Sequence, residues 1–199
     1  MLKRKRINIL VSSSEDVQKE RSITEQSIRR VAAEFDLQVS ASYCNGLRRS
    51  KPDETRPTGK DNGEDGLLCP YFLEHQDSRD DLEHSEHILN PGQYDLVIKI
   101  LWSRLGARLA SMAVMPDGSQ PGSASEYEIA WALYQSKQTP GSPELRVYRN
   151  RATPAALLEP KEKRENLCRQ WDAVQEFCAA WEYGETRFRD CCHEYQDLE

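Results

Sequence analysis

The chain has 199 residues, of which 38% are hydrophobic and 30% are charged, a composition typical of a globular domain rather than a disordered chain. Its formal net charge of −6 argues against a general nucleic-acid binder, because such proteins usually carry a basic face. No stretch approaches the roughly 20 apolar residues of a membrane-spanning helix, and the first apolar run is too short for a signal peptide. We therefore expect a cytoplasmic protein that does not associate with a membrane.

Motifs for metals and phosphates are missing from the sequence. Six cysteines are present, but none forms a C-x-x-C pair and no histidine stands at zinc-ligand spacing from a cysteine pair. The sequence also lacks the G-x-x-x-x-G-K-[ST] phosphate loop and the G-x-G-x-x-G dinucleotide fingerprint. We expect free thiols, no metal site and no resident cofactor, and any ATPase fused to this domain lies outside residues 1–199.

The first predicted elements are a strand, a helix and a second strand. The run from Ile7 to Val11 is apolar and predicts a buried strand. Ser12 and Ser13 then stand as N-caps of a helix that runs to about Phe35. The alternation from 37 to 43 predicts the second strand.

The region that follows is polar. Residues 45–66 are rich in charged residues, proline and glycine, and they predict a long flexible loop that folding does not need. Apolar character returns over 67–75. Residues 80–89 predict a short helix, which ends at Asn90-Pro91-Gly92.

The strongest strand signal is the near-continuous apolar run from Tyr94 to Trp102, which suits a central parallel strand covered on both faces. A helix over 126–136, a strand over 145–148 and an amphipathic helix over 161–181 follow, and then a polar tail. Strands that alternate with helices predict a single α/β domain with a TIR- or flavodoxin-like parallel sheet. Within it we expect 7–11 and 96–101 to be adjacent interior strands.

Three segments resemble the motifs of one uncharacterised domain family. The residues from Val11 to Arg21 resemble its "VSSxxDVxxER" opening, and those from Tyr94 to Gly106 resemble its "YDIVxxxxWSRLG" strand and turn. The residues from Ser125 to Arg149 resemble its "TExExxxA…LLVYR" segment, and the aromatic residues of 170–199 also match. Two positions depart from the pattern, because Ser125 replaces the commoner threonine and Leu73 stands where a tryptophan is expected.

That family is TIR-like and usually precedes a NACHT or AAA-type ATPase with WD40 or TPR repeats in bacterial signalling and defence proteins of the STAND class. The resemblance implies that this chain is an effector module of an antiviral defence protein. The implied partners are a fused or associated ATPase, repeat domains and further copies of the domain itself.

Glu126 and Glu128 are the candidate catalytic residues. The segment 125–132 resembles the acidic helix start of nucleoside deoxyribosyltransferases and of TIR-type NAD glycohydrolases, where a glutamate acts at the ribose C1′. Glu128 matches the deoxyribosyltransferase position best, and the spacing places Glu126 on a different side of the helix. The alternative is structural, because the helix dipole favours acidic residues in a first turn.

Candidate ligand-binding residues follow the predicted strands, where parallel sheets bind their ligands. Ser12 and Ser13 could bind a phosphate, although ordinary N-capping is the favoured interpretation. Trp102, Ser103 and Arg104 could line a pocket, or Trp102 could belong to the core and Arg104 could pair with a nearby acid. A further candidate is Asp16, which together with the Glu20-Arg21 pair is better explained by a structural ion-pair or capping network.

Two functions therefore stay open. The first is a signalling and interaction module that acts through self-association. The second is a nucleotide N-glycosidase that hydrolyses NAD or a related nucleotide with Glu128. For the enzyme, Glu128→Gln is expected to abolish turnover and to leave the melting temperature nearly unchanged, because the amide keeps the shape of the side chain but not its charge.

Overall fold

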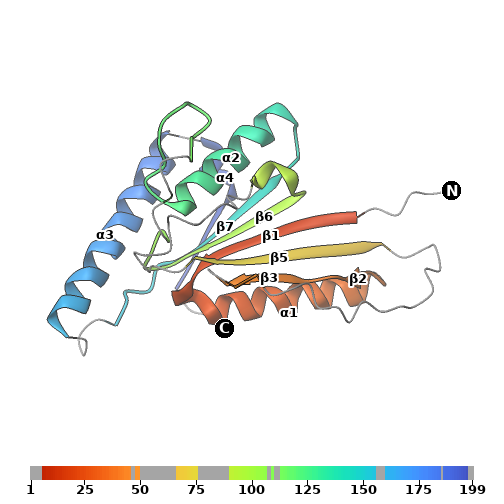
Figure 1. Ribbon diagram of the computed structural model, residues 1–199, viewed down its shortest axis with the longest axis horizontal. Helices are drawn as coiled ribbons and strands as arrows, with labels where there is room; N and C mark the ends of the chain where they lie inside the picture. Colours follow the sequence, from red (N-terminus) through yellow and green to blue (C-terminus); the bar gives the residue numbers. More distant parts are fainter. Residues whose placement is uncertain are drawn as a thin grey trace.

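A single sheet with helices on both faces forms the domain (Figure 1). The computed structural model describes residues 6–45, 48–49, 66–75, 90–106, 109, 113–155, 160–184 and 186–196. The strands are β1 (Arg6–Ser14), β2 (Gln38–Val39), β3 (Ser42–Asn45), β4 (Arg48–Arg49), β5 (Leu67–His75), β6 (Leu96–Leu101), β7 (Glu144–Asn150) and β8 (Cys192–Tyr195). The helices are α1 (Gln18–Glu34), α2 (Ala124–Gln138), α3 (Lys161–Gly184) and α4 (Thr186–Cys191), with short 3-10 turns η1 (Glu15–Val17) and η3 (Pro91–Gln93).

The strand order is β4-β3-β5-β1-β6-β7-β8, and β2 pairs with the start of β5. Among the residues that the structure describes, every strand pair is parallel except the short β3–β4 pair. β1 lies between β5 and β6, with Leu10 opposite Val97 and Ser12 opposite Lys99. The predicted α/β fold with two adjacent interior parallel strands is therefore confirmed.

The two faces of the sheet bury separate cores, because alternate residues of a strand point to opposite faces. Figure 1 shows α1 along one face and α2, α3 and α4 on the other. Ile9 and Val11 of β1 pack in the core on the α1 side, whereas Leu10 packs with residues of α2 and α3. This alternation decides which helix each serine at the end of β1 meets.

The first strand is longer than predicted and the following helix starts later. β1 continues through Ser14, η1 follows, and α1 begins only at Gln18. The prediction that Ser12 and Ser13 cap the helix is therefore wrong, since both lie inside the strand. Both serines are fully buried, and their hydroxyls find partners on neighbouring elements instead of on the helix backbone.

β5 is a nine-residue interior strand although it contains Pro70, which has no N–H to donate. The neighbouring chain is interrupted at that level: β2 pairs with β5 up to Leu68, and β3 resumes the pairing at Tyr71. The missing donor therefore falls where the ladder is broken, which is the position in a sheet that tolerates proline. Most of the predicted 45–66 loop and the predicted 80–89 helix lie outside the described residues, but 48–49 within that loop form β4.

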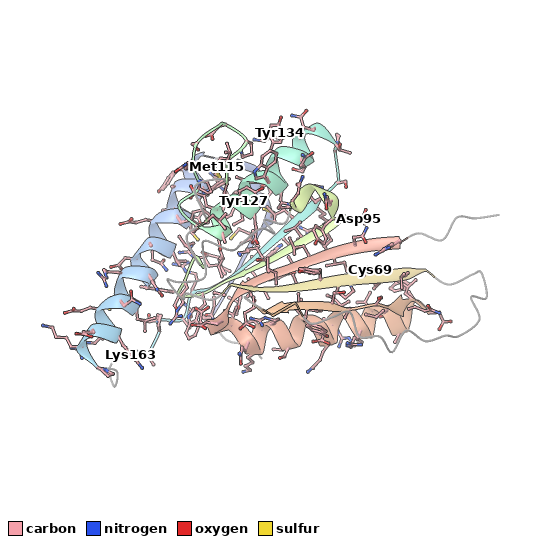
Figure 2. All side chains as sticks on the ribbon, in the orientation of Figure 1. Cys69, Asp95, Met115, Tyr127, Tyr134 and Lys163 are labelled. Atoms are coloured by element: carbon pink, nitrogen blue, oxygen red, sulfur yellow. The ribbon has the colours of Figure 1, made fainter. Side chains whose placement is uncertain are left out.

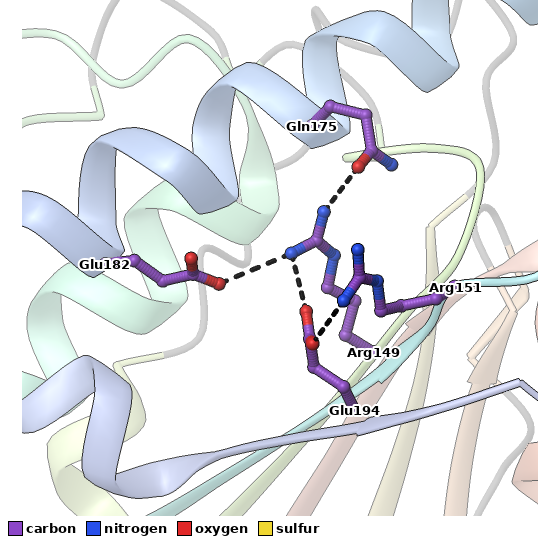
Figure 3. Close-up of polar contacts among 5 residues, drawn as sticks. All are labelled: Arg149, Arg151, Gln175, Glu182 and Glu194. Carbon is purple, nitrogen blue, oxygen red and sulfur yellow. Dashed lines mark hydrogen bonds and ion pairs between the residues drawn. The ribbon is translucent and has the colours of Figure 1, made fainter.

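The C-terminal segment joins the sheet instead of ending as a polar tail. β8 adds to the edge of β7 in parallel, and the backbone N–H of Arg151 donates to the carbonyl of Tyr195 over 2.7 Å. Arg149 of β7 links β8 to α3, and its side chain is only 7% exposed (Figure 3). Its guanidinium donates to Gln175 of α3 and pairs with Glu194 of β8, over 2.5 and 2.8 Å.

Candidate functional site

The carboxyl end of β1 carries three consecutive serines that divide between the two faces of the sheet. Ser12 meets α2, Ser13 meets α1, and Ser14 donates a short hydrogen bond to Asp16 at the start of η1. Each hydroxyl thereby anchors a different polar cluster.

The first cluster is a buried set of three residues, Ser12, Lys99 and Glu128, which we call the buried triad. The Lys99 ammonium donates to Glu128 Oε2 over 2.8 Å and to Ser12 Oγ over 2.9 Å. Ser12 Oγ in turn donates to the same carboxylate oxygen over 2.6 Å. The three side chains come from β1, β6 and α2, and the residues are 0%, 1% and 3% exposed.

The sheet and helix together explain how this triad forms. Ser12 and Lys99 are register partners on neighbouring strands, so their side chains leave the same face side by side. Lys99 stands between Val97 and Leu101 on that face, and both are core residues. A charge in such apolar surroundings needs a close counter-ion and further hydrogen bonds, and Glu128 and Ser12 provide them.

Two phenol groups, those of Tyr94 and Tyr127, have pKa values that the charge of Glu128 helps to raise. Burial, and then the negative charge of Glu128, raise the pKa of both Tyr94 and Tyr127 above the ordinary value of 10. Both phenols therefore stay neutral near neutral pH. They can serve as hydrogen-bonding groups there but not as anions.

The other candidate catalytic residue, Glu126, has a different environment. Ser123 caps α2 by accepting from the N–H of Glu126 over 3.2 Å. The Glu126 carboxylate accepts from the N–H of Gly122 over 2.5 Å, so it closes the loop before the helix. Glu126 is half-buried whereas Glu128 is buried, which agrees with the prediction that the two side chains lie on different sides of the helix.

The second cluster ties α1 to two strand ends. Arg21 forms an ion pair with Glu74 of β5 over 2.7 Å, and it also donates to Ser13 Oγ and to the carbonyl of Ser14 over 3.0 and 3.2 Å. Both ionic side chains are mostly buried, at 15% and 8% exposure. Arg21 does form an ion pair, but with Glu74 and not within the predicted network with Asp16 and Glu20, and its guanidinium donates to Ser13 on the α1 side of the sheet.

The third cluster joins η1 to the residues after β6. Asp16 Oδ2 accepts from both the N–H and the hydroxyl of Ser103, over 2.9 and 2.7 Å. Arg104 forms an ion pair with Glu15, and the indole N–H of Trp102 donates to the carbonyl of Ala152 over 2.7 Å. These contacts hold the turn after β6 against η1 and against the segment after β7, and Arg104 does pair with a local acid.

A surface cavity of about 450 Å³ opens beside this third cluster, at the carboxyl edge of the sheet. It is lined by Glu15, Asp16, Gln18, Lys19, Glu20, Trp102, Asn150 and Gln196. Two of the predicted ligand-binding residues, Asp16 and Trp102, are among them, but Glu126 and Glu128 are not. Three carboxylates against one lysine give the cavity an acidic lining, which suits a phosphate-bearing ligand poorly.

Sequence reasoning missed Lys99, Glu74 and Asn150. Lys99 interrupts an otherwise apolar strand, and a single lysine in a strand covered on both faces must reach either an edge or a buried acid. That lone interruption is the signal that could have identified it.

Asn150 lines the cavity and donates to Glu20 over 3.2 Å, while Tyr195 of β8 donates to the same Glu20 oxygen over 3.3 Å.

Comparisons with protein-family models, with curated proteins and with solved structures found no match. In the described part of the chain, no group of three or more His, Cys, Asp or Glu residues is placed to hold a metal ion. No helix within the described ranges is long and apolar enough to cross a membrane.

Proposed function

We propose that this chain is an interaction module of a bacterial STAND-type signalling protein, and that it works through contacts between copies of itself when the fused or associated ATPase assembles. The observation that carries the proposal is the burial of Glu128 inside the buried triad. Glu128, the best candidate for a catalytic carboxylate, is 3% exposed and paired with Lys99. A nucleophile or a charge that stabilises a ribosyl cation must touch its substrate, and this carboxylate lies outside the lining of the carboxyl-edge cavity.

The properties of that cavity also support an interaction module. An NAD molecule carries two phosphates, and sites for such groups use helix N-termini, glycine-rich loops or arginines. Here η1 begins with Glu15 and Asp16, and Arg104 is paired with Glu15. The motif resemblance to N-terminal domains of STAND proteins supplies the partner class, an ATPase with repeat domains.

A second candidate function is the nucleotide N-glycosidase. One observation favours it: a charged carboxylate is held in apolar surroundings at the end of the sheet where α/β folds bind ligands. This function requires α2 to move away from the sheet, because only then can Glu128 reach a ribose.

The two proposals are separated by clustering the chain on a tetrameric coiled coil and incubating it with NAD. The matched control is the double variant Lys99→Met/Glu128→Gln, which removes both charges together and so avoids leaving one buried charge unpaired. The module predicts new protection from amide exchange on clustering, and no released nicotinamide from either protein. If the natural chain releases nicotinamide and the double variant does not, the interaction module is overturned and the enzyme is established.

A further inference from the structure

The outer side of α2 carries three aromatic residues in a row, Tyr127, Trp131 and Tyr134, which we call the α2 aromatic stripe. Successive members are four and three residues apart, so they lie along one face of the helix. Their ring centroids are 6.2 and 5.6 Å apart, and the indole N–H of Trp131 donates to the carbonyl of Val114 over 3.0 Å. Tyr134 is 39% exposed and Val114 is 47% exposed. Figure 2 labels Tyr127 and Tyr134 along α2, on the side of the sheet away from α1.

The opposite side of α2 already forms the core. Ile129, Ala132 and Leu133 are buried against β6, β7 and α3. A surface helix of a monomeric protein normally presents polar residues on its outer face, whereas this helix presents aromatic residues there as well. Tyr127 and Trp131 are half-buried and Tyr134 is exposed, so solvent reaches part of the row, and tyrosine and tryptophan on such surfaces are enriched at protein interfaces.

The charges of α2 indicate what covers the stripe. Glu126 and Lys137 are the outer charges of the helix, and they lie equally far on either side of the midpoint between Trp131 and Ala132. They are separated by about three helical turns, so both lie on the same flank of the helix. A two-fold axis through that midpoint therefore places Glu126 of one copy beside Lys137 of the other, and it aligns the helix dipoles antiparallel.

We propose that the α2 aromatic stripe is the interface through which two copies of this chain associate, with their α2 helices antiparallel. The Trp131 rings meet at the two-fold axis. Tyr127 of each copy enters the space between Tyr134 and Gln138 of the other, because its symmetry position falls midway between them. The bond from Gly122 uses one oxygen of Glu126, and a carboxylate can accept further hydrogen bonds, so the lysine of the second copy finds an acceptor.

This proposal rests on the proposed function, since it names the surface through which the module contacts itself. Its test is sedimentation equilibrium of the 199-residue chain over a concentration series up to about 1 mM, the weak end of specific association. Trp131→Ala is expected to raise the dimer dissociation constant about tenfold or more, as truncation of a central aromatic residue does at an interface. Tyr183→Ala is the matched control, because Tyr183 is 91% exposed at the end of α3, and it is expected to change nothing.

The charge pairing is tested separately. Lys137→Glu is expected to weaken dimerisation several-fold, because it sets an acid against Glu126 of the other copy in each of the two symmetric pairs, and Glu126→Lys/Lys137→Glu is expected to restore it. Arg30→Glu, on the exposed side of α1, is the charge control and is expected to have no effect. Three results would each overturn the proposal. Trp131→Ala and Tyr183→Ala could weaken dimerisation equally, the double exchange of Glu126 and Lys137 could fail to restore it, or the chain could stay monomeric at every concentration. None of these outcomes bears on nicotinamide release by the clustered chain, so the failure of this interface and the failure of the proposed function can be told apart.

Discussion

Removing one charge of the buried triad is expected to destabilise the domain strongly. Glu128→Gln leaves the Lys99 ammonium, 1% exposed, without its counter-ion, and breaking a buried ion pair in this way costs about 3–5 kcal/mol. For a domain of this size each kcal/mol lowers the melting temperature by roughly 2–4 °C, so the expected fall is roughly 6–20 °C. The expectation from sequence that this substitution leaves the melting temperature unchanged is therefore replaced by a large decrease.

The assay is a double-mutant cycle of Lys99→Met, Glu128→Gln and the two combined, measured by urea denaturation. The combined variant removes both charges and keeps an amide acceptor for Ser12, so it is expected to be more stable than either single variant. Glu126→Gln is the matched control, because its carboxylate is half-buried and accepts from one backbone N–H, and it should cost within about 1 kcal/mol. A Glu128→Gln variant as stable as this control, or strictly additive effects in the cycle, would refute the reasoning.

Further predictions concern the C-terminal half of the domain. Burial raises the pKa of the Cys178 thiol from 9 to about 11, so the folded state keeps a proton that the unfolded state loses above pH 9. The contribution of the Cys178 thiol to the free energy of unfolding should therefore be fully present below pH 9 and fall by about 2–3 kcal/mol between pH 9 and 11, and Cys178→Ala should remove that share of the decline in urea titrations. The exposed thiol of Cys168 should react with a disulfide reagent well before that of Cys192, whose pKa is raised to about 12 by burial; equal rates would contradict the placement of β8. Arg149→Met should lower stability by about 1–3 kcal/mol and release β8 to amide exchange, whereas Arg151→Met, at a side chain 54% exposed, should have little effect.

Two interior strands of the sheet, β1 and β6, were predictable because each contains an apolar run, whereas the interior strand β5 was not predicted as a strand. β1 and β6 are covered on both faces, so hydrophobic burial alone marks them in the sequence. β8 carries no such mark, since Cys-His-Glu-Tyr has no apolar run. It pairs with β7 through backbone contacts and the Glu194 ion pairs to Arg149 and Arg151, which are fixed only after the chain has folded.

The candidate site was predictable in part. Residues after β1 and β6 do meet at the carboxyl edge, as the topology of a parallel sheet requires, and Asp16 contacts Ser103 there. The partners of each side chain could not be foreseen, because they depend on which face each residue occupies. The sequence placed Ser12 at the start of a helix, whereas it lies inside β1. Its partners, Lys99 and Glu128, lie 87 and 116 residues away in the sequence.

The state of α2 in the assembled protein tests the central claim most directly. The measurement is an experimental structure of the chain clustered on its oligomerising scaffold, with the distance from Lys99 Nζ to Glu128 Oε2 as the observable. The interaction module predicts that this distance stays within ion-pair range, near the 2.8 Å of the single chain, and that Glu128 remains buried. An α2 displaced from the sheet, with the Glu128 carboxylate open to solvent or to a bound nucleotide, would contradict it.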